Sequence, residues 1–486
     1  MNSSVAIMKR KIIYTILLVL VLTDVGYSFL QHYNTPFDGD MAAGIVPAED
    51  VKPTLESPFG LKVFKEEITY PNPNRFFCHW IFYQYFNNIP LFLQRYMNPI
   101  DSAYMSCALS KTVIQIAILV LLSIAISGNT NIFRLEFILA AVLITPLFQT
   151  NGYRSDMGII DPSTTYTFFY ALPTALLLLY FAPLILIHHY NKGLKRFKYI
   201  KVLWIPFALI SSLSGPLNPG IALVFSLLLF TQNILKNIEK SGSSNILNKL
   251  KYALQLIPKD YIFFLIPICL FSLYSLFLGR YNSVDHNNEM SLTQLYLRLP
   301  EGVYNQFTQK LGFPVLFSVL LINMIIINSK FKTEEGKKIL RIFKWIGLFA
   351  LVYTLLLPIG GYRGYRPNVL RYDMIIPITL SLMFIFGKTT IFIIKNISYI
   401  QKFWYLPLII LVMFIFTNSD EPKFDKNDCE RMAIVKIVES SESVVKINDN
   451  CTVLAWSKIE KPEDSKLKVQ LLELWGIINE KKLYYQ

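Results

Sequence analysis

The feature that most constrains this chain is a series of continuous apolar runs separated by short polar segments. Each run is about 15 to 25 residues long, which is enough for a helix to cross the hydrocarbon core of a bilayer. Strands of a transmembrane barrel would alternate apolar and polar residues, and these runs do not. The sequence therefore predicts an all-α polytopic membrane protein with about 11 transmembrane helices.

Composition supports this prediction and excludes several classes of protein. Charged residues make up 16% of the chain and hydrophobic residues 53%, whereas roughly a quarter of a soluble domain is charged. A soluble enzyme, a disordered chain and a disulfide-rich secreted domain are therefore excluded. The net charge of +14 does not indicate a nucleic-acid partner, because Lys and Arg lie mostly in short loops, as the positive-inside rule describes.

The first apolar run, from about residue 12 to 30, follows the basic segment Met8-Lys9-Arg10-Lys11. This pattern is compatible with a signal peptide. The run is long and lacks a small-x-small cleavage site, so we interpret it as a retained first span with its N-terminus inside. Ten further spans are predicted near residues 103–127, 132–149, 166–188, 202–214, 219–235, 261–279, 312–328, 343–358, 374–388 and 403–417.

This topology divides the chain into two predicted domains. Residues 1–417 form the transmembrane domain, including a long first outer loop at 31–102. Residues 418–486 form a small exported α+β domain with strands at 444–447 and 452–456 and a helix at 467–478. Its Cys429 and Cys451 could pair in an oxidising compartment, or remain free thiols.

The first outer loop opens with Pro36-Phe37-Asp38-Gly39-Asp40, directly after span one. Asp38 and Asp40 could hold a divalent cation, or one of them could act as a general base with a raised pKa. A solvated Asp-Gly turn is the alternative. Residues 76–97 are aromatic but interrupted by polar residues, which predicts a helix lying in the membrane interface; a true span is the alternative.

Two further outer loops carry charged residues. The second holds Asp156 and Asp161, and the loop before span ten reads Gly361-Tyr362-Arg363-Gly364-Tyr365-Arg366-Pro367-Asn368-Val369-Leu370-Arg371. Phosphate oxygens could be bound by Arg363, Arg366 and Arg371. Tyr362 and Tyr365 could stack on a sugar or line the entrance for a lipid phosphate. The alternative is that the arginines reach phospholipid headgroups, with Arg371 paired to Asp373.

This layout resembles the C-type integral-membrane glycosyltransferase superfamily, which includes protein O-mannosyltransferases, oligosaccharyltransferases and lipid A aminoarabinose transferases. The resemblance covers the whole chain as an architecture and rests on Pro36-Phe37-Asp38-Gly39-Asp40, with weaker support from Asp156 or Asp161 and from the arginine loop. Members more often have adjacent acidic residues, whereas Gly39 intervenes here. Which Asp is the base, and whether a divalent metal takes part, therefore stay open.

The resemblance implies transfer of a sugar from a polyprenyl-phosphate carrier to a glycan, lipid or protein acceptor on the outer face of a bacterial cell membrane. Asp38 or Asp40 would deprotonate or orient the acceptor hydroxyl. The negative charge on the departing phosphate would be stabilised by Arg363, Arg366 and Arg371. A polysaccharide polymerase or ligase is a second hypothesis. A non-enzymatic transporter or flippase of lipid-linked sugars is a third, although it requires polar residues within several spans.

Overall fold

A computed structural model describes residues 2–148, 158–190, 201–242, 245–285, 290–309, 311–360, 368–422 and 424–486. Within these ranges, nine helices are long and apolar enough to cross a membrane. They are Ile7–Tyr33, Pro99–Ser127, Thr164–Ile187, Asn218–Ile238, Lys259–Gly279, Gly312–Lys330, Glu334–Gly360, Ile376–Asn396 and Tyr399–Ser419. The prediction of a helical multi-pass membrane protein is confirmed. Two shorter apolar helices, Leu135–Leu147 and Lys201–Ser212, coincide with the remaining predicted spans.

The helices of the bundle carry the following labels and bounds in the order of the chain. They are α1 (Asn2–Tyr33), α6 (Pro99–Ser127), α7 (Leu135–Ile144), α9 (Thr164–Tyr166), α10 (Leu172–His188), α12 (Trp204–Ser212), α13 (Asn218–Ile238), α15 (Lys259–Gly279), α18 (Gly312–Lys330), α19 (Glu334–Leu356), α20 (Ile376–Asn396) and α21 (Tyr399–Ser419). A π-helical stretch at Thr167–Ala171 joins α9 to α10, so that the two form one span.

Shorter helices occupy the loops. They are α2 (Met41–Ile45), α3 (Lys52–Glu56), α4 (Leu61–Glu66), α5 (Phe76–Leu93), α14 (Ile246–Gln255), α16 (Leu292–Leu297) and α17 (Leu299–Thr308). Among them, α5 is the helix predicted at 76–97, and it is not one of the candidate spans. Its position in a membrane interface stays a prediction.

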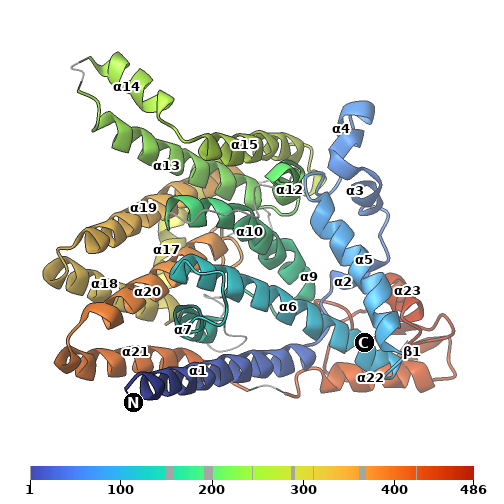
Figure 1. Cartoon of the computed structure of the whole chain (residues 1–486). Coiled ribbons are helices and arrows are strands. Elements are labelled where there is room, and N and C mark those ends of the chain that lie inside the picture. The colour runs from blue at the N-terminus through green and yellow to red at the C-terminus, as the bar shows by residue number, and fades with distance from the viewer. Residues whose placement is uncertain are drawn as a thin grey trace.

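The centre of the bundle is α6, which packs against α1, α7, α10, α5 and α20. Its ends follow from local sequence: the Asn98 side chain accepts a hydrogen bond from the Asp101 N–H at 2.9 Å, Pro99 occupies the first turn, and Gly128 ends the helix in a left-handed conformation at φ 66°. In Figure 1, α1 runs from the N-terminus to the opposite end of the bundle, where α22, α23 and α2 gather.

Residues 418–486 contain α22 (Asp428–Glu439), β1 (Val444–Lys446), α23 (Lys466–Leu474) and β2 (Leu483–Tyr485). The strands pair in parallel, with Val445 opposite Tyr484. The strand predicted at 444–447 is therefore present, whereas 452–456 has no regular structure, which makes that expectation wrong. Cys429 and Cys451 form a disulfide, so the open question of their pairing is answered.

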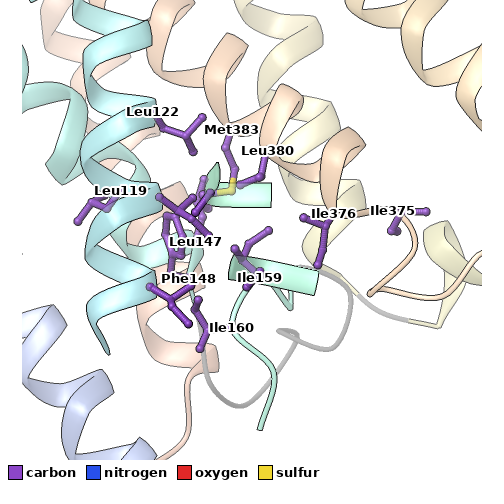
Figure 2. Packing of buried hydrophobic residues seen from close by; sticks show 14 of the residues in the cluster. Leu119, Leu122, Leu147, Phe148, Ile159, Ile160, Ile375, Ile376, Leu380 and Met383 are labelled. Atoms are coloured by element: carbon purple, nitrogen blue, oxygen red, sulfur yellow. The ribbon is translucent and has the colours of Figure 1, made fainter. Parts of the chain in front are cut away.

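Part of the buried core lies where the segment before α9 returns to the bundle. Figure 2 shows Ile159 and Ile160 of this segment in the same cluster as Leu122 of α6 and Leu380 and Met383 of α20. Isoleucine side chains buried in this way anchor the next residue, Asp161, which is itself buried. The hydrophobic cluster thus brings a charged residue of a loop against the spans.

Candidate functional site

The first element of the site is the turn that carries Asp38. Phe37 fixes this turn, because its ring stacks on Tyr104 of α6 with centroids 4.0 Å apart and lies 5.5 Å from the ring of Trp475. Its backbone N–H donates to Glu430 Oε2 at 2.8 Å. The aromatic residue in the Pro-Phe-Asp sequence therefore attaches the acidic turn to a span and to the C-terminal segment.

Asp38 is buried, and the start of α9 holds its carboxylate. The Thr165 hydroxyl donates to Asp38 Oδ1 at 2.7 Å, and the Thr165 N–H donates to Oδ2 at 3.0 Å. Thr165 can do this because Ser163 caps α9 by accepting from the Tyr166 N–H. Burial raises the pKa of Asp38, the hydrogen bonds from Thr165 oppose this, and the charge of Asp40 adds to it.

Asp40 differs from Asp38, since its residue is only half-buried. Among the described residues, no hydrogen bond or ion pair engages the Asp40 carboxylate, while its backbone oxygen accepts from the Gly44 N–H at 3.3 Å. Asp38 is thus built into the protein and Asp40 is the carboxylate available to another molecule.

A buried lysine that sequence reasoning missed lies beside these acids. Lys111 of α6 is 0% exposed, its ammonium donates to the backbone oxygen of Pro162, and it interacts electrostatically with Asp38 and Asp161. An uncompensated ammonium in a bundle core costs several kcal/mol, so the acids stabilise it. The signal was present, because a lysine within an apolar run is itself an indication of function.

Asp161 joins this group from the segment between α7 and α9. Its Oδ1 accepts from the Ser163 N–H at 2.7 Å. Burial raises the pKa of Asp161 to about 6, against the opposing effects of the Tyr372 hydroxyl, the Ser163 N–H and Lys111. Tyr372 belongs to the segment before α20, so residues more than 200 positions apart in the chain meet here.

Of the predicted phosphate-binding arginines, Arg371 is described, and it forms an ion pair. Its Nε and Nη2 donate to the two carboxylate oxygens of Asp373 at 3.0 and 2.9 Å. This is the pairing expected of a structural arginine, and Asp373 in turn acts electrostatically on Asp161. The other predicted residues, Asp156, Tyr362, Arg363, Tyr365 and Arg366, lie outside the described residues.

The C-terminal segment takes part in the site through Glu430 of α22, a second residue that sequence reasoning missed. Besides the Phe37 N–H, this buried carboxylate accepts from the Tyr104 hydroxyl at 2.8 Å and from the Leu454 N–H at 2.9 Å. Burial raises the pKa of Glu430 to about 7, these donors lower it, and Asp38 raises it. One side chain therefore ties α22 to the acidic turn and to the segment around Leu454.

Next to Leu454, Trp456 covers the middle of the acidic turn. A Cβ atom added to Gly39 would lie 2.5 Å from Cδ1 of Trp456 and 2.6 Å from its backbone nitrogen, so only glycine fits between Asp38 and Asp40. Trp456 stacks with Tyr166, with centroids 5.7 Å apart and an interplanar angle of 28°. The close approach explains why Gly39 separates the two acids.

The donor set does not favour a resident divalent cation. Both oxygens of Asp38 accept hydrogen bonds from Thr165, and within the described residues no three His, Cys, Asp or Glu side chains gather in a metal-binding cluster. The ammonium of Lys111 nearby also opposes a cation. We therefore derive no step through a metal.

Polar residues also lie within the spans. His32 Nε2 and Gln115 Oε1 are 3.2 Å apart, and Gln115 donates to Ser28 Oγ at 3.1 Å. Thr145 donates to Asp24 at 2.7 Å. The helices α1 and α6 thus share a buried polar layer.

Comparison of the chain with models of protein families, with curated proteins and with solved structures finds no match. The site must therefore be interpreted from its own chemistry.

Proposed function

We propose that this protein is a membrane glycosyltransferase that moves a sugar from a polyprenyl-phosphate carrier to an acceptor hydroxyl. The observation that carries this proposal is the convergence of two buried charged residues on the segment before α9, where Thr165 binds Asp38 and the Pro162 oxygen accepts from Lys111 of α6. A bundle that needed only to span a membrane would not bury such a group, because each charge costs free energy unless it is paired.

The chemistry follows from what each residue can do. Asp40 accepts the proton of the acceptor hydroxyl as its oxygen attacks the anomeric carbon and the bond from that carbon to the phosphate oxygen breaks. The electron pair of that bond leaves with the polyprenyl phosphate. Asp38 is a positioning residue, since Thr165 holds both of its oxygens. Arg363 and Arg366 stabilise the negative charge on the departing phosphate.

The same proposal includes eleven spans, an inside N-terminus and an outside C-terminal domain at 418–486, in a bacterial cell membrane. Support comes from the disulfide between Cys429 and Cys451, because such bonds persist in oxidising compartments. The two short apolar helices supplement the nine long ones found among the described residues. The polymerase or ligase hypothesis gains no separate support from the described contacts.

The test is sugar transfer in membranes that contain Asp40→Asn or Asp38→Asn protein. Loss of a general base typically lowers a rate by a factor of about 10² to 10⁴, so Asp40→Asn should reduce transfer by at least about 100-fold with normal expression and insertion. Asp38→Asn, which keeps an oxygen for one Thr165 donor, should reduce it less. Full activity in both variants would refute the assignment.

A second function, transport or flipping of a lipid-linked sugar, is favoured by one observation, the buried layer formed by Ser28, His32 and Gln115. Polar side chains inside spans are typical of transport pathways. His32→Leu should then abolish movement of a fluorescent polyprenyl-phosphate sugar across proteoliposomes, whereas a transferase should show no such movement even in the wild-type protein.

A further inference from the structure

An exposed tryptophan of the C-terminal segment touches the acidic turn itself. Trp456 is 57% exposed, yet its edge and backbone lie so close to Gly39 that no side chain fits there. Exposing an indole forgoes the free energy of burying a large apolar side chain. A single exposed aromatic needs no explanation by itself, but this one is packed against the only glycine between two acids.

The second observation is that Trp456 is presented by a rigid support. Glu430 accepts from the Leu454 N–H at 2.9 Å, and the Tyr484 hydroxyl donates to the Val453 oxygen at 2.8 Å. The disulfide at Cys451 joins the start of the same segment to α22. These contacts fix the backbone immediately before Trp456. The tryptophan is therefore held at a defined position on the acidic turn.

The third observation is the partner ring. Tyr166 stacks on Trp456 and follows Thr165, the residue that binds Asp38. It also meets Tyr170 edge-to-face at 6.1 Å. Neighbouring residues of α9 therefore bind the Asp38 carboxylate and support the Trp456 ring. The half-buried Asp40 follows Gly39 in the same acidic turn.

We propose that Trp456, supported by Tyr166, is the subsite that takes a pyranose ring beside Asp40. The C–H groups on one face of a pyranose are apolar and slightly positive, so they pack on the electron-rich face of an indole. The hydroxyl groups at the ring edge donate to a carboxylate. This proposal rests on the proposed function, sugar transfer. It assigns the binding of the sugar ring to Trp456, a residue of the C-terminal segment.

The ring could belong to the lipid-linked donor or to a free acceptor glycan. Binding assays on the full-length protein in nanodiscs separate the two. The donor probes are undecaprenyl phosphates carrying glucose, galactose, mannose or N-acetylglucosamine, with bare undecaprenyl phosphate as the probe that has no ring. The acceptor probes are soluble oligosaccharides of the same sugars.

In these assays, Trp456→Ala should weaken binding of at least one sugar-bearing probe by about 10-fold, with bare undecaprenyl phosphate bound as in the wild type. Trp456→Phe keeps an aromatic face and should lose less than about 3-fold. Trp80→Ala is the matched control, because Trp80 is 45% exposed on α5 and should leave every probe unaffected.

If Trp456→Ala binds every sugar-bearing probe with the affinity of the wild type, the subsite is refuted. Equal affinities of Trp456→Ala and the control Trp80→Ala would refute it too. That result leaves the transferase proposal standing if Asp40→Asn still abolishes transfer. Conversely, Trp456-dependent binding of soluble oligosaccharides by a wild-type protein that transfers no sugar would refute the transferase and retain the subsite. If the wild-type protein binds none of the sugar-bearing probes, the subsite is refuted as well.

Discussion

Two lysines are held by α6, Lys388 beside its C-terminal end and Lys111 in its interior, but for different reasons. At its C-terminal end, Lys388 of α20 donates to the Tyr190 hydroxyl at 3.0 Å, and that hydroxyl donates to the last carbonyl oxygens of the helix, at Ala125 and Ile126. A cation beside a helix C-terminus is stabilised by the helix itself. Nothing beyond the architecture is required to explain Lys388.

Lys111 has no such explanation, because it lies in the interior of α6, where the backbone groups already bond one another. Its ammonium donates to the Pro162 oxygen, and Asp38 and Asp161, from separate loops, interact with it electrostatically. The comparison teaches that a charge satisfied by its own helix end indicates architecture, whereas a charge satisfied only by distant loops indicates a site.

The largest expected effect comes from removing each lysine. Lys111→Met should lower the free energy of unfolding by about 3 kcal/mol, the upper range for a hydrogen bond from a charged group, because it leaves the Pro162 oxygen without its donor. Lys388→Met should cost about 1 kcal/mol, the value of an ordinary hydrogen bond. Thermal unfolding in detergent measures both. Equal losses of unfolding free energy in the two variants would contradict the distinction between Lys111 and Lys388.

The next effect concerns pH. The pKa of Glu430 is about 7 in the folded protein and 4.5 when unfolded, so the folded state holds the proton more tightly. Its contribution to stability is complete below about pH 4.5 and is lost as pH rises through 7, by up to about 3 kcal/mol. Glu430→Gln cannot titrate, so the difference in unfolding free energy from the wild type should vary with pH across this window.

The groups that face Glu430 are Tyr104, Asp38 and Tyr484, and they are retained in the Gln variant. The control at the other end of α6 is Glu335→Gln, because Glu335 interacts with Lys388 and is exposed. Its free energy of unfolding should lie close to that of the wild type. A difference between Glu430→Gln and the wild type that does not vary with pH would show that the Glu430 carboxylate does not titrate in this window.

An effect smaller than that at Glu430 is expected at Arg371. Replacement by Gln removes the two hydrogen bonds to Asp373 and should cost about 1.5 kcal/mol of unfolding free energy. Lys338→Gln provides the comparison at the other end, where Lys338 donates to the His189 oxygen at 2.6 Å from an exposed position, and it should cost less. A larger loss for Lys338→Gln would reverse the ranking of the ends.

Several parts of the fold follow from local sequence. A helical bundle, the positions of the long spans and the ends of α6 depend on apolar run length and on capping residues such as Asn98 and Gly128, all of which can be seen without a structure. The irregular conformation of residues 452–456 could not be foreseen in this way. The apolar residues of this segment suggest a strand, but Leu454 takes a positive φ of 48° and Glu430 binds its N–H.

The sequence by itself determined that this protein crosses a membrane and that acids follow its first span, because hydrophobic run length and residue order are local properties. Only the tertiary structure decided that Asp38 binds Thr165, that Glu430 joins the C-terminal segment to the acidic turn, and that Trp456 lies on Gly39. Those contacts join residues tens to hundreds of positions apart. Buried charges select their partners by proximity in the folded bundle, which no local pattern encodes.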